Sequence, residues 1–442
     1  MMEALRIALW RGWLHLTGPV PGHCATLERL RHGGLEAYRA ERLTALLAHA
    51  GRAVPFYRQR LAEAGVLVDG RVRLDRFAAI PPLTRGELRA RFDDLVAEGV
   101  DRARCRVNVT GGSTGEPVRV LEDAGADAWN VATKLLFDGW TGYRPGMRRA
   151  VLWTSLHEAP SRRLRPRVGR WLRGETWVDC LRLSDAELHA AAQSLADLRP
   201  RQILAFADRL HGIARLMAEG RVPVVMPDSL VVSSCPCTPR MRAVIERAFQ
   251  APLFDRYGSR ELGAVAGERR PGGGLVVSAP THIVEVLRPD GSPAPPGEVG
   301  ELVVTLLTNH AMPLIRYRIG DRAAWALEAD DPWPVLTRIA GRTSDTFTAM
   351  DGATVDSALF LYVLEERPWV ARYRVTQETQ ARVLVEVVPA SPPPPADLAD
   401  IERRIQAVMG SACAVEIRMV EDIPVGRSGK FRYLVSRVAA GA

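Results

Sequence analysis

Between about residue 105 and residue 260 the chain alternates short apolar runs with helix-like segments. The apolar runs are RRAVLWTS, RQILAFA, DSLVVSS and APLFDRYGS, and helical patterns such as DAELHAAAQSLADL and RLHGIARLMAEG stand between them. Short apolar runs separated by helices are typical of parallel strands that are buried on both faces. The alternation therefore predicts an α/β domain built around a largely parallel sheet.

The segments on either side of this region have different patterns. Residues from about 25 to 100 form helical patterns broken by prolines, and Thr84 followed by Glu87 is a capping-box signature. From about 274 to 326 the apolar runs lengthen, as in GLVVSAPTHIVEVLRPDG and GELVVTLLT, with glycine and proline turns between them. This second pattern predicts a β-rich subdomain within the same body.

After about residue 340 the composition changes again. A strand-like ARVLVEVV leads into SPPPP, and Leu398, Ile401, Ile405 and Val408 follow at helical spacing before CAVEIRMV. We therefore expect a large multi-layer α/β body over residues 1–340 and a small C-terminal α+β lid over residues 341–442. The hinge between them is expected near residues 340–346.

Composition excludes several classes of protein. The 442 residues are 47% hydrophobic and 25% charged, as in globular chains, and no apolar run approaches the ~20 residues of a membrane span. The N-terminus lacks the pattern of a secretory signal, and the six cysteines follow no disulfide or zinc spacing, which fits a reducing cytoplasm. No basic block is interleaved with aromatic residues, so nucleic acid is not an expected partner.

Two segments of the N-terminal half are basic and partly apolar. MMEALRIALWRGWLHL has the pattern of an amphipathic helix, which we expect to pack on the body of the protein rather than on a membrane. In a chain of net charge +8, SRRLRPRVGRWLR carries six arginines: Arg162, Arg163, Arg165, Arg167, Arg170 and Arg173. They form either a solvated face or a landing patch for a phosphate-bearing or acidic partner.

Lysine is scarce in this chain: of its 59 basic residues two are lysines and 57 are arginines. Lys430 ends the loop VGRSGK, where Gly426, Ser428 and Gly429 favour a flexible backbone that could carry one ammonium group into a site elsewhere. The guanidinium of arginine is planar, whereas the ammonium of lysine is a compact point charge. A retained lysine therefore favours a function that needs a compact charge. The alternative is that Lys430 is an ordinary solvated lysine. The other lysine, Lys134 in the helical run VATKLLFDGW, serves as the comparison and looks incidental.

The segment NVTGGSTGEPVRV, residues 108–120, concentrates hydroxyl groups and glycines in one loop. Backbone N–H groups and hydroxyls at such close range favour a loop that cradles phosphates over a plain glycine-rich turn. The segment is not a P-loop, because it lacks the GxxxxGK[ST] spacing. The candidate phosphate ligands are Thr110, Gly111, Gly112, Ser113, Thr114 and Gly115.

Three further motifs place polar groups after apolar strands. DRYGSRELG puts Tyr257 and Gly258 at a strand end and Glu261 three residues beyond the glycine. A carboxylate at Glu261 could hold Mg²⁺ against a triphosphate, or it could be a solvated loop residue. YRIGD ends on Asp321, a short acceptor suited to ribose hydroxyls, and RIAGRTSD places Arg342 at the expected domain junction.

Taken in order, TGGSTGEP, YGSRE, YRIGD, GRTSD and VGRSGK resemble the adenylate-forming superfamily of acyl-CoA synthetases, luciferases and adenylation domains. Within it, VPFYRQRL, IPPLTRGELRA and AMPLIRYRIGD resemble the phenylacetate–CoA ligase branch. The resemblance covers the chain from about residue 50 to residue 440.

The resemblance implies a nucleotide-binding role for five residues outside the glycine-rich loop. Tyr257 would stack on adenine, and Gly258 and Ser234 would belong to the same ATP site. Asp321 would bind the ribose hydroxyls, aided by Arg342.

The resemblance also assigns the catalytic groups. The loop from Thr110 to Gly115 would bind the ATP phosphates, and Glu261 would bind Mg²⁺. Lys430 would bond the substrate carboxylate and the bridging oxygen during adenylation, where charge builds on the α-phosphate.

The chain departs from the family pattern at three places. After the strand that precedes the adenine site it has SSCPC, with Cys235, Pro236 and Cys237, where relatives have Gly-Glu-Pro or similar. Arg260 precedes Glu261 in place of Thr or Ser, and Ser344 stands at the hinge position in place of Asp or Lys. These departures bear on the adenine pocket, the phosphate geometry and the domain rotation.

The implied activity is ATP- and Mg²⁺-dependent activation of a carboxylic acid, with an aryl acid as the default of the branch. The acyl-AMP would pass its acyl group to the thiol of coenzyme A or of a carrier-protein phosphopantetheine, or to an amine. The alternative is a relative that no longer adenylates and transfers acyl groups between CoA and a carrier protein, or acts as a binding partner. The sequence leaves a homodimer open.

Overall fold

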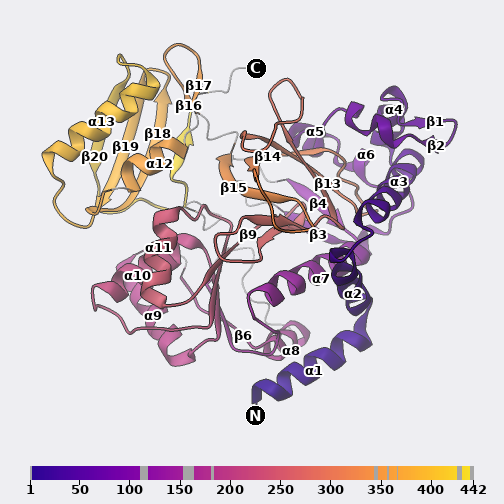
Figure 1. The fold of residues 1–442 in the computed structure, drawn as a ribbon, viewed down its shortest axis with the longest axis horizontal. Helices are drawn as coiled ribbons and strands as arrows, with labels where there is room; N and C mark the ends of the chain where they lie inside the picture. Colours follow the sequence, from indigo (N-terminus) through magenta and orange to yellow (C-terminus); the bar gives the residue numbers. More distant parts are fainter. Residues whose placement is uncertain are drawn as a thin grey trace.

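The computed structural model describes residues 2–109, 118–152, 164–180, 184–342, 347–355, 358–365, 367–425 and 431–438. Helices dominate its N-terminal part (Figure 1), as the sequence predicts. The elements are α1 (Met2–Thr17), α2 (Val20–Arg31), α3 (Leu35–Ala53), α4 (Pro55–Glu63), β1 (Leu67–Val68), β2 (Arg71–Val72), η1 (Leu74–Ala79), α5 (Arg85–Ala90), α6 (Phe92–Leu95) and η2 (Arg102–Arg104). Helix α5 begins with the predicted capping box, in which the Thr84 N–H donates to the Glu87 carboxylate at 2.8 Å.

The middle of the chain supplies strands and helices in alternation. They are β3 (Arg106–Val109), β4 (Arg119–Glu122), α7 (Ala124–Trp140), β5 (Arg149–Leu152), α8 (Leu164–Arg173), β6 (Glu175–Trp177), α9 (Asp185–Leu198), β7 (Gln202–Ala205), α10 (Ala207–Ala218), β8 (Ser229–Ser233), α11 (Pro239–Phe249) and β9 (Leu253–Ser259). The strands that follow are β10 (Gly263–Glu268), β11 (Leu275–Val277), β12 (His282–Leu287), β13 (Gly300–Leu306), β14 (Tyr317–Trp325) and β15 (Val335–Arg342).

Eleven strands in the described part of the chain form one sheet, in the order β12-β13-β14-β15-β11-β10-β9-β8-β7-β5-β6. Pairings from β6 to β9 are parallel, which confirms the predicted α/β arrangement. From β9 to β12 every pairing is antiparallel. The predicted β-rich segment is therefore present, but it extends the parallel sheet through the β9–β10 hairpin instead of forming a sheet of its own.

Helices cover both faces of the parallel strands. Because strand residues alternate between faces, Ala150, Ile203 and Val232 pack together with α9, α10 and α11 in one buried cluster. Arg149 and Gln202 point to the opposite face, under α7. There the Arg149 guanidinium lies 2.7 Å from the carboxylate of Asp138 on α7 and donates to the Gln202 amide oxygen at 2.8 Å.

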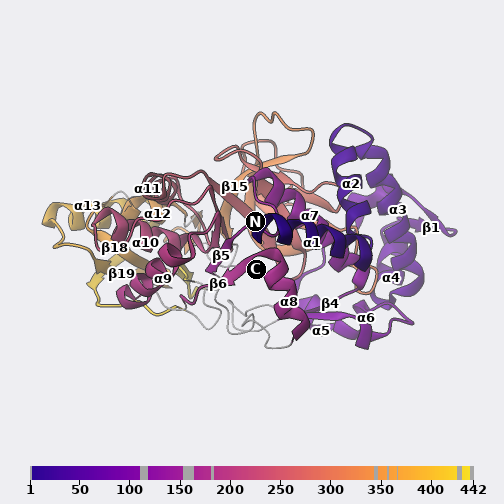
Figure 2. The same cartoon turned by 90° about the horizontal axis from the view of Figure 1, so that it is seen from below.

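The C-terminal segment forms a second, smaller sheet with its own helices. Its elements are β16 (Phe347–Thr348), β17 (Thr354–Val355), α12 (Ala358–Glu365), β18 (Val370–Thr379), β19 (Arg382–Pro389), α13 (Pro395–Met409), β20 (Ala414–Met419) and β21 (Leu434–Ser436). Four strands pair in the order β20-β19-β18-β21 around a separate apolar core. Figures 1 and 2 show this unit at the opposite end of the molecule from α2, α3 and α4.

We expect Asp138→Asn to destabilise the body strongly. The Asp138 carboxylate, which is 6% exposed, faces both Arg149 and Arg256, at 2.7 and 3.3 Å. Without its charge, Arg256 loses this counterion and Arg149 keeps only the more distant Glu175, at 3.9 Å. Breaking a buried pair typically costs about 3–5 kcal/mol. The melting temperature of each variant measures the effect.

Asp93→Asn is the matched control, because Asp93 also pairs with an arginine, Arg102 at 2.7 Å, but its side chain is 77% exposed. Exposed pairs contribute about 0–1 kcal/mol, so this variant should melt close to the wild type. Equal melting temperatures for the two variants would show that the buried cluster does not hold α7 on the sheet.

Candidate active site

The candidate site lies where the parallel strands end. Strands β8 and β9 pair in parallel, so their carboxyl ends reach the same edge of the sheet and bring Ser234 and Tyr257 to that edge. Ligands of open α/β sheets bind outside the carboxyl ends of such strands. Strand β14 supplies Asp321, which pairs across the ladder with Arg342 of β15.

Tyr257 and Asp321 are in direct contact. The Tyr257 hydroxyl donates to the Asp321 carboxylate with an oxygen–oxygen distance of 2.6 Å, within the range of hydrogen bonds to charged acceptors. Asp321 is 8% exposed and Tyr257 is half-buried, so the contact is only partly open to solvent. Two residues that lie 64 positions apart, and that the sequence assigns to adenine and ribose, thus share one corner of the structure.

Gly258 is required by the close approach of the next strand. It pairs with Ala264 in the β9–β10 hairpin, and a Cβ atom at position 258 would lie 2.4 Å from the Gly263 carbonyl oxygen. Any side chain there would push the hairpin open. The glycine therefore allows the turn that carries Glu261 to fold back tightly beside Tyr257.

Glu261 occupies the turn between β9 and β10. Its carboxylate is largely buried, and one oxygen lies 3.5 Å from both the Arg85 guanidinium and the Tyr317 hydroxyl. Burial and the nearby Glu261 charge raise the pKa of Tyr317, which stays protonated and can donate to the carboxylate. These distances are at the long limit of hydrogen bonding, so the carboxylate keeps acceptor capacity for another ligand.

Arg85 is a site residue that the sequence analysis missed. It stands at the first position of α5, directly after the capping Thr84, and reaches a carboxylate 176 residues away. The available signal was the motif LTRGEL, from which a helix cap and a family resemblance were inferred but no role for Arg85. An arginine in the first turn of a helix is unusual beside the positive end of the helix dipole, and this is the hint that a distant carboxylate holds it.

Arg260 links Glu261 to the glycine-rich loop. Its guanidinium donates to the carbonyl oxygen of Val109 at 2.9 Å, and Val109 is the last residue of β3 before that loop. Thr or Ser at this position would be too short to make the same bond. The departure from the family pattern therefore supplies a clamp at the base of the loop.

The SSCPC segment begins with a strained turn. Ser234 adopts φ of +70°, in the left-handed region that favours glycine. The Cys235 sulfur accepts from the Ala207 N–H at 3.1 Å, and burial raises the pKa of the thiol to about 12. A neutral buried thiol with a structural partner is a poor metal ligand, and no cluster of three or more potential metal-ligating side chains occurs among the residues that the structure describes.

His282 supports the backbone next to Glu261. Its Nε2 lies 2.9 Å from the Leu262 carbonyl oxygen, and its Nδ1 lies 2.9 Å from the Thr281 hydroxyl. Since a carbonyl can only accept, Nε2 carries the proton, and Nδ1 faces the Thr281 hydroxyl, which also donates to the Ser278 carbonyl oxygen at 3.0 Å. Burial lowers the pKa of His282 to about 4, so the ring is neutral at pH 7.

Several predicted site residues lie outside the described part of the chain. These are Thr110, Gly111, Gly112, Ser113, Thr114, Gly115, Ser344 and Lys430. The backbone of Arg342 is described as the last residue of β15. The roles of all these residues stay predictions.

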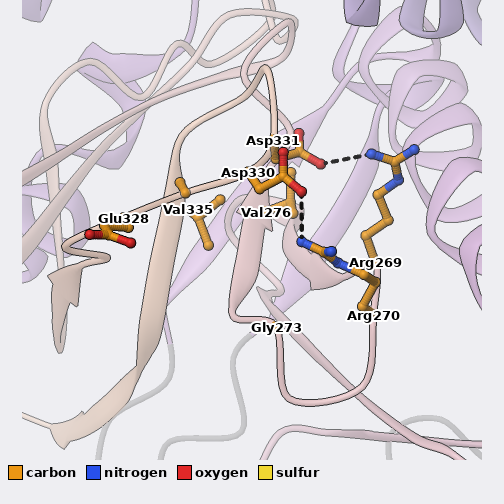
Figure 3. A pocket seen from close by; sticks show the side chains of 9 residues that line it. Arg269, Arg270, Gly273, Val276, Glu328, Asp330, Asp331 and Val335 are labelled. Atoms are coloured by element: carbon orange, nitrogen blue, oxygen red, sulfur yellow. Dashed lines mark hydrogen bonds and ion pairs between the residues drawn. The ribbon is translucent and has the colours of Figure 1, made fainter.

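A recess of about 450 Å³ lies away from these residues, beside the turns that join β10 to β11 and β14 to β15 (Figure 3). Four of its charged side chains form two ion pairs. Arg269 lies 3.3 Å from Asp331, and Arg270 lies 3.4 Å from Asp330. Asp321 and Trp325 stand at different positions along β14, and the recess is at the Trp325 end, so we assign it no part in the candidate site.

Comparison with known proteins identifies the family. A phenylacetate–coenzyme A ligase from Thermus thermophilus is 30% identical over 340 residues, which cover 72% of this chain and 73% of that protein. The chain belongs to the phenylacetate–CoA ligase family. A family member from Escherichia coli is 27% identical over 321 residues, and the CapK protein of Staphylococcus aureus is 23% identical over 277 residues, 60% of this chain and 59% of that protein. Residues 347–437 match the family described as the CapK C-terminal domain.

Solved structures confirm the predicted fold class. A 2-hydroxyisobutyryl-CoA ligase in complex with an acyl-AMP has a TM-score of 0.69 at 19% identity, covering 91% of this chain and 89% of its own. An anthranilate CoA ligase in complex with anthranoyl-AMP has a TM-score of 0.55 at 16% identity, covering 76% and 67%. None of the helices that the structure describes has the length and apolar character needed to span a bilayer.

Lowering the pH should reduce the free energy of unfolding of this protein, partly through His282. Because the folded-state pKa is about 4 and the unfolded value about 6.5, the unfolded chain binds the proton more readily between these values. The free energy of unfolding therefore falls, by up to about 1.4 kcal/mol per pH unit, as pH drops from about 6.5 to about 4. In His282→Gln, whose amide can still donate to Leu262, the melting temperature should fall less over this range than in the wild type.

His32→Gln is the control, because the His32 side chain, after α2, is 79% exposed. Its melting temperature should follow that of the wild type at every pH. If the His282 variant also loses as many degrees as the wild type between pH 7 and 4.5, His282 does not couple pH to stability.

Proposed function

We infer that this protein is an AMP-forming acid–CoA ligase. It uses ATP to convert a carboxylic acid into an acyl-AMP and then transfers the acyl group to coenzyme A. Membership of the phenylacetate–CoA ligase family supports the reaction type. The observation that carries the assignment is the Tyr257–Asp321 hydrogen bond of 2.6 Å, because it brings together the two residues predicted for adenine and ribose. Glu261, predicted for Mg²⁺, is buried in the turn that follows β9.

We propose that Tyr257 packs against adenine and that Asp321 accepts hydrogen bonds from the ribose hydroxyls, to which Arg342 donates. The glycine-rich loop, clamped at its base by Arg260, would hold the phosphates. A carboxylate oxygen of the acid then bonds to the α-phosphorus while the bond to pyrophosphate breaks, and Lys430 neutralises the charge that develops there.

The fit of Glu261 to Mg²⁺ follows from its surroundings. Mg²⁺ in nucleotide sites is usually held by one or two carboxylates, the substrate phosphates and water. One buried carboxylate with acceptor capacity meets this requirement, and no further cluster of acidic ligands is needed. When bound, the ion would neutralise charge on the phosphates, while Arg85 and Tyr317 keep the Glu261 side chain oriented.

The acyl acceptor and the carboxylic acid substrate are proposed from the relatives' named activities. Coenzyme A is the acceptor that the family supports, and a carrier-protein phosphopantetheine or an amine is the alternative nucleophile. We propose an aryl acid, following the named activity of the relatives from Thermus thermophilus and Escherichia coli. A relative that no longer adenylates would need neither Glu261 nor Lys430, and both are present in this chain.

We further propose that residues 1–340 and 341–442 act as body and lid, and that the protein works in the cytoplasm. Gly341, at φ of +123°, lies within the proposed hinge at residues 340–346, and Gly352, at φ of +84°, follows it; both have conformations that side chains rarely adopt. Two such glycines allow a few backbone dihedrals to absorb a rotation. The rotation would withdraw Lys430 after adenylation and admit the thiol.

Lys430→Ala should block the first half-reaction and spare the second. Loss of one preorganised charge contact typically lowers the rate by about 10²–10³. Acyl-AMP formation should fall by this factor, whereas transfer from pre-made acyl-AMP to coenzyme A should stay near the wild-type rate. Both half-reactions are measured on the same preparation, so the transfer assay is the folding control. Adenylation at the wild-type rate would remove Lys430 from the mechanism.

Glu261→Gln should raise the Mg²⁺ concentration needed for half-maximal adenylation while leaving the melting temperature nearly unchanged. The matched control is Glu268→Gln, since Glu268 is equally buried, on β10, but is bound at 2.8 Å by Arg242. That variant should lose stability because Arg242 loses its partner, and it should keep the wild-type Mg²⁺ requirement. The reverse pattern would make Glu261 a structural residue.

A further inference from the structure

Lys134 lies on the side of α7 that faces the sheet. Asn130, one turn before it, accepts at its side-chain oxygen from the Ala264 N–H at 3.0 Å, and Asp138, one turn after it, lies 3.3 Å from Arg256. Residues four positions apart share one side of a helix. Lys134 is therefore placed between these two contacts, over β9 and its hairpin partner β10.

The Lys134 ammonium forms no hydrogen bond or ion pair with any residue that the structure describes, and the side chain is exposed. Two carboxylates attract it, those of Glu122 and Asp127, but other groups hold both. Asp127 pairs with Arg106 at 3.0 Å. Glu122 accepts from the Asn108 amide at 2.9 Å and lies 4.0 Å from the same arginine. The ammonium is thus available to a ligand.

Positive charge predominates around Lys134. Arg256 shares the Asp138 carboxylate with Arg149, which lies 2.7 Å from it, so one anion serves two guanidinium groups. Desolvation, followed by the charges of Arg256 and Arg106, lowers the pKa of Lys134. A lysine that extends into open solvent would have neither cause of this shift. The protein therefore holds an ammonium where an additional anion would be stabilising.

The two faces of β9 separate Lys134 from the proposed nucleotide residues. Neighbouring residues of a strand point to opposite faces, so Arg256 points towards α7 and Tyr257 points away from it, to its contact with Asp321. A nucleotide that packs on Tyr257 would leave the α7 side of β9 to the other substrate. Lys134 and Arg256 are therefore placed to contact the carboxylic acid.

We propose that Lys134, together with Arg256, binds a second carboxylate of the acid substrate, at the end remote from the carboxylate that reacts. Lysine and arginine supply only hydrogen-bond donors, and a carboxylate is the acceptor that also balances their charge. An uncharged aryl ring would leave the Lys134 charge unmatched. The inference rests on the proposed ligase function and narrows its aryl acid to an aryl dicarboxylic acid.

The test compares phenylacetate with 3-carboxyphenylacetate and 4-carboxyphenylacetate in acid-dependent exchange of labelled pyrophosphate into ATP. For the wild type we expect kcat/KM to be about 10- to 100-fold higher with a carboxyphenylacetate, the gain of a hydrogen bond to a charged group. Lys134→Met keeps an unbranched side chain without the charge, and this preference should fall at least about tenfold. Lys134→Glu should instead favour 4-(aminomethyl)phenylacetate over the dicarboxylic acids.

The matched control is Arg73→Met, which removes one positive charge from a side chain that is 55% exposed beside β2. It should keep the wild-type preference between the acids. All three variants should keep the wild-type melting temperature, because Lys134 has no described partner to lose and Arg73 belongs to an exposed pair.

Three results would overturn the proposal. They are equal kcat/KM for phenylacetate and both carboxyphenylacetates in the wild type, an unchanged preference in Lys134→Met, and a raised KM for ATP in Lys134→Met without a change in preference. The last result would assign Lys134 to the ATP phosphates. Exchange with phenylacetate but with neither dicarboxylic acid would keep the proposed function and reject this inference.

Absence of exchange with every acid would contradict the proposed function itself. Calorimetric binding of the carboxyphenylacetates to the wild type and to Lys134→Met then decides the role of Lys134 separately. Binding that weakens at least about tenfold in Lys134→Met would support the second-carboxylate site, and equal binding to both proteins would overturn it.

Discussion

Strand β9 pairs in parallel with β8 on one side and antiparallel with β10 on the other, and the candidate site depends on this change of direction. The parallel side delivers Tyr257 to the carboxyl edge of the sheet. The antiparallel side folds the chain back at once, so that Glu261 lies in the turn next to it. The same ladder continues to β14 and β15 and brings Asp321 against Tyr257. One continuous sheet therefore positions residues that would be far apart on two separate sheets.

Much of the fold and part of the site could be predicted from the sequence. The apolar runs that became β5, β7, β8 and β9 are short and bounded by helices, which is a local signal. Tyr257, Glu261 and Asp321 could be predicted because each lies in a motif of contiguous residues. The contacts of Arg85 with Glu261 and of Arg260 with Val109 join residues 176 and 151 positions apart. Such contacts follow from how elements pack, which spacing along the chain does not encode.

The structure shows which contacts two of the departures from the family pattern make. Arg260 reaches a backbone carbonyl that a shorter side chain could not reach, and so ties the Glu261 turn to the strand before the glycine-rich loop. Cys235 accepts a backbone N–H and stays protonated, which makes it a packing residue and not a metal ligand. His282 holds the carbonyl of Leu262 from the other side.

The central claim is that this site adenylates a carboxylic acid and passes the acyl group to a thiol. The most direct test is acid-dependent exchange of labelled pyrophosphate into ATP by the wild-type protein, with phenylacetate and other aryl acids as substrates and thioester yield measured in the same reactions. The account predicts exchange that requires both an acid and Mg²⁺, and thioester formation once coenzyme A is added. Acyl transfer between coenzyme A and a carrier protein without any acid-dependent exchange would contradict it.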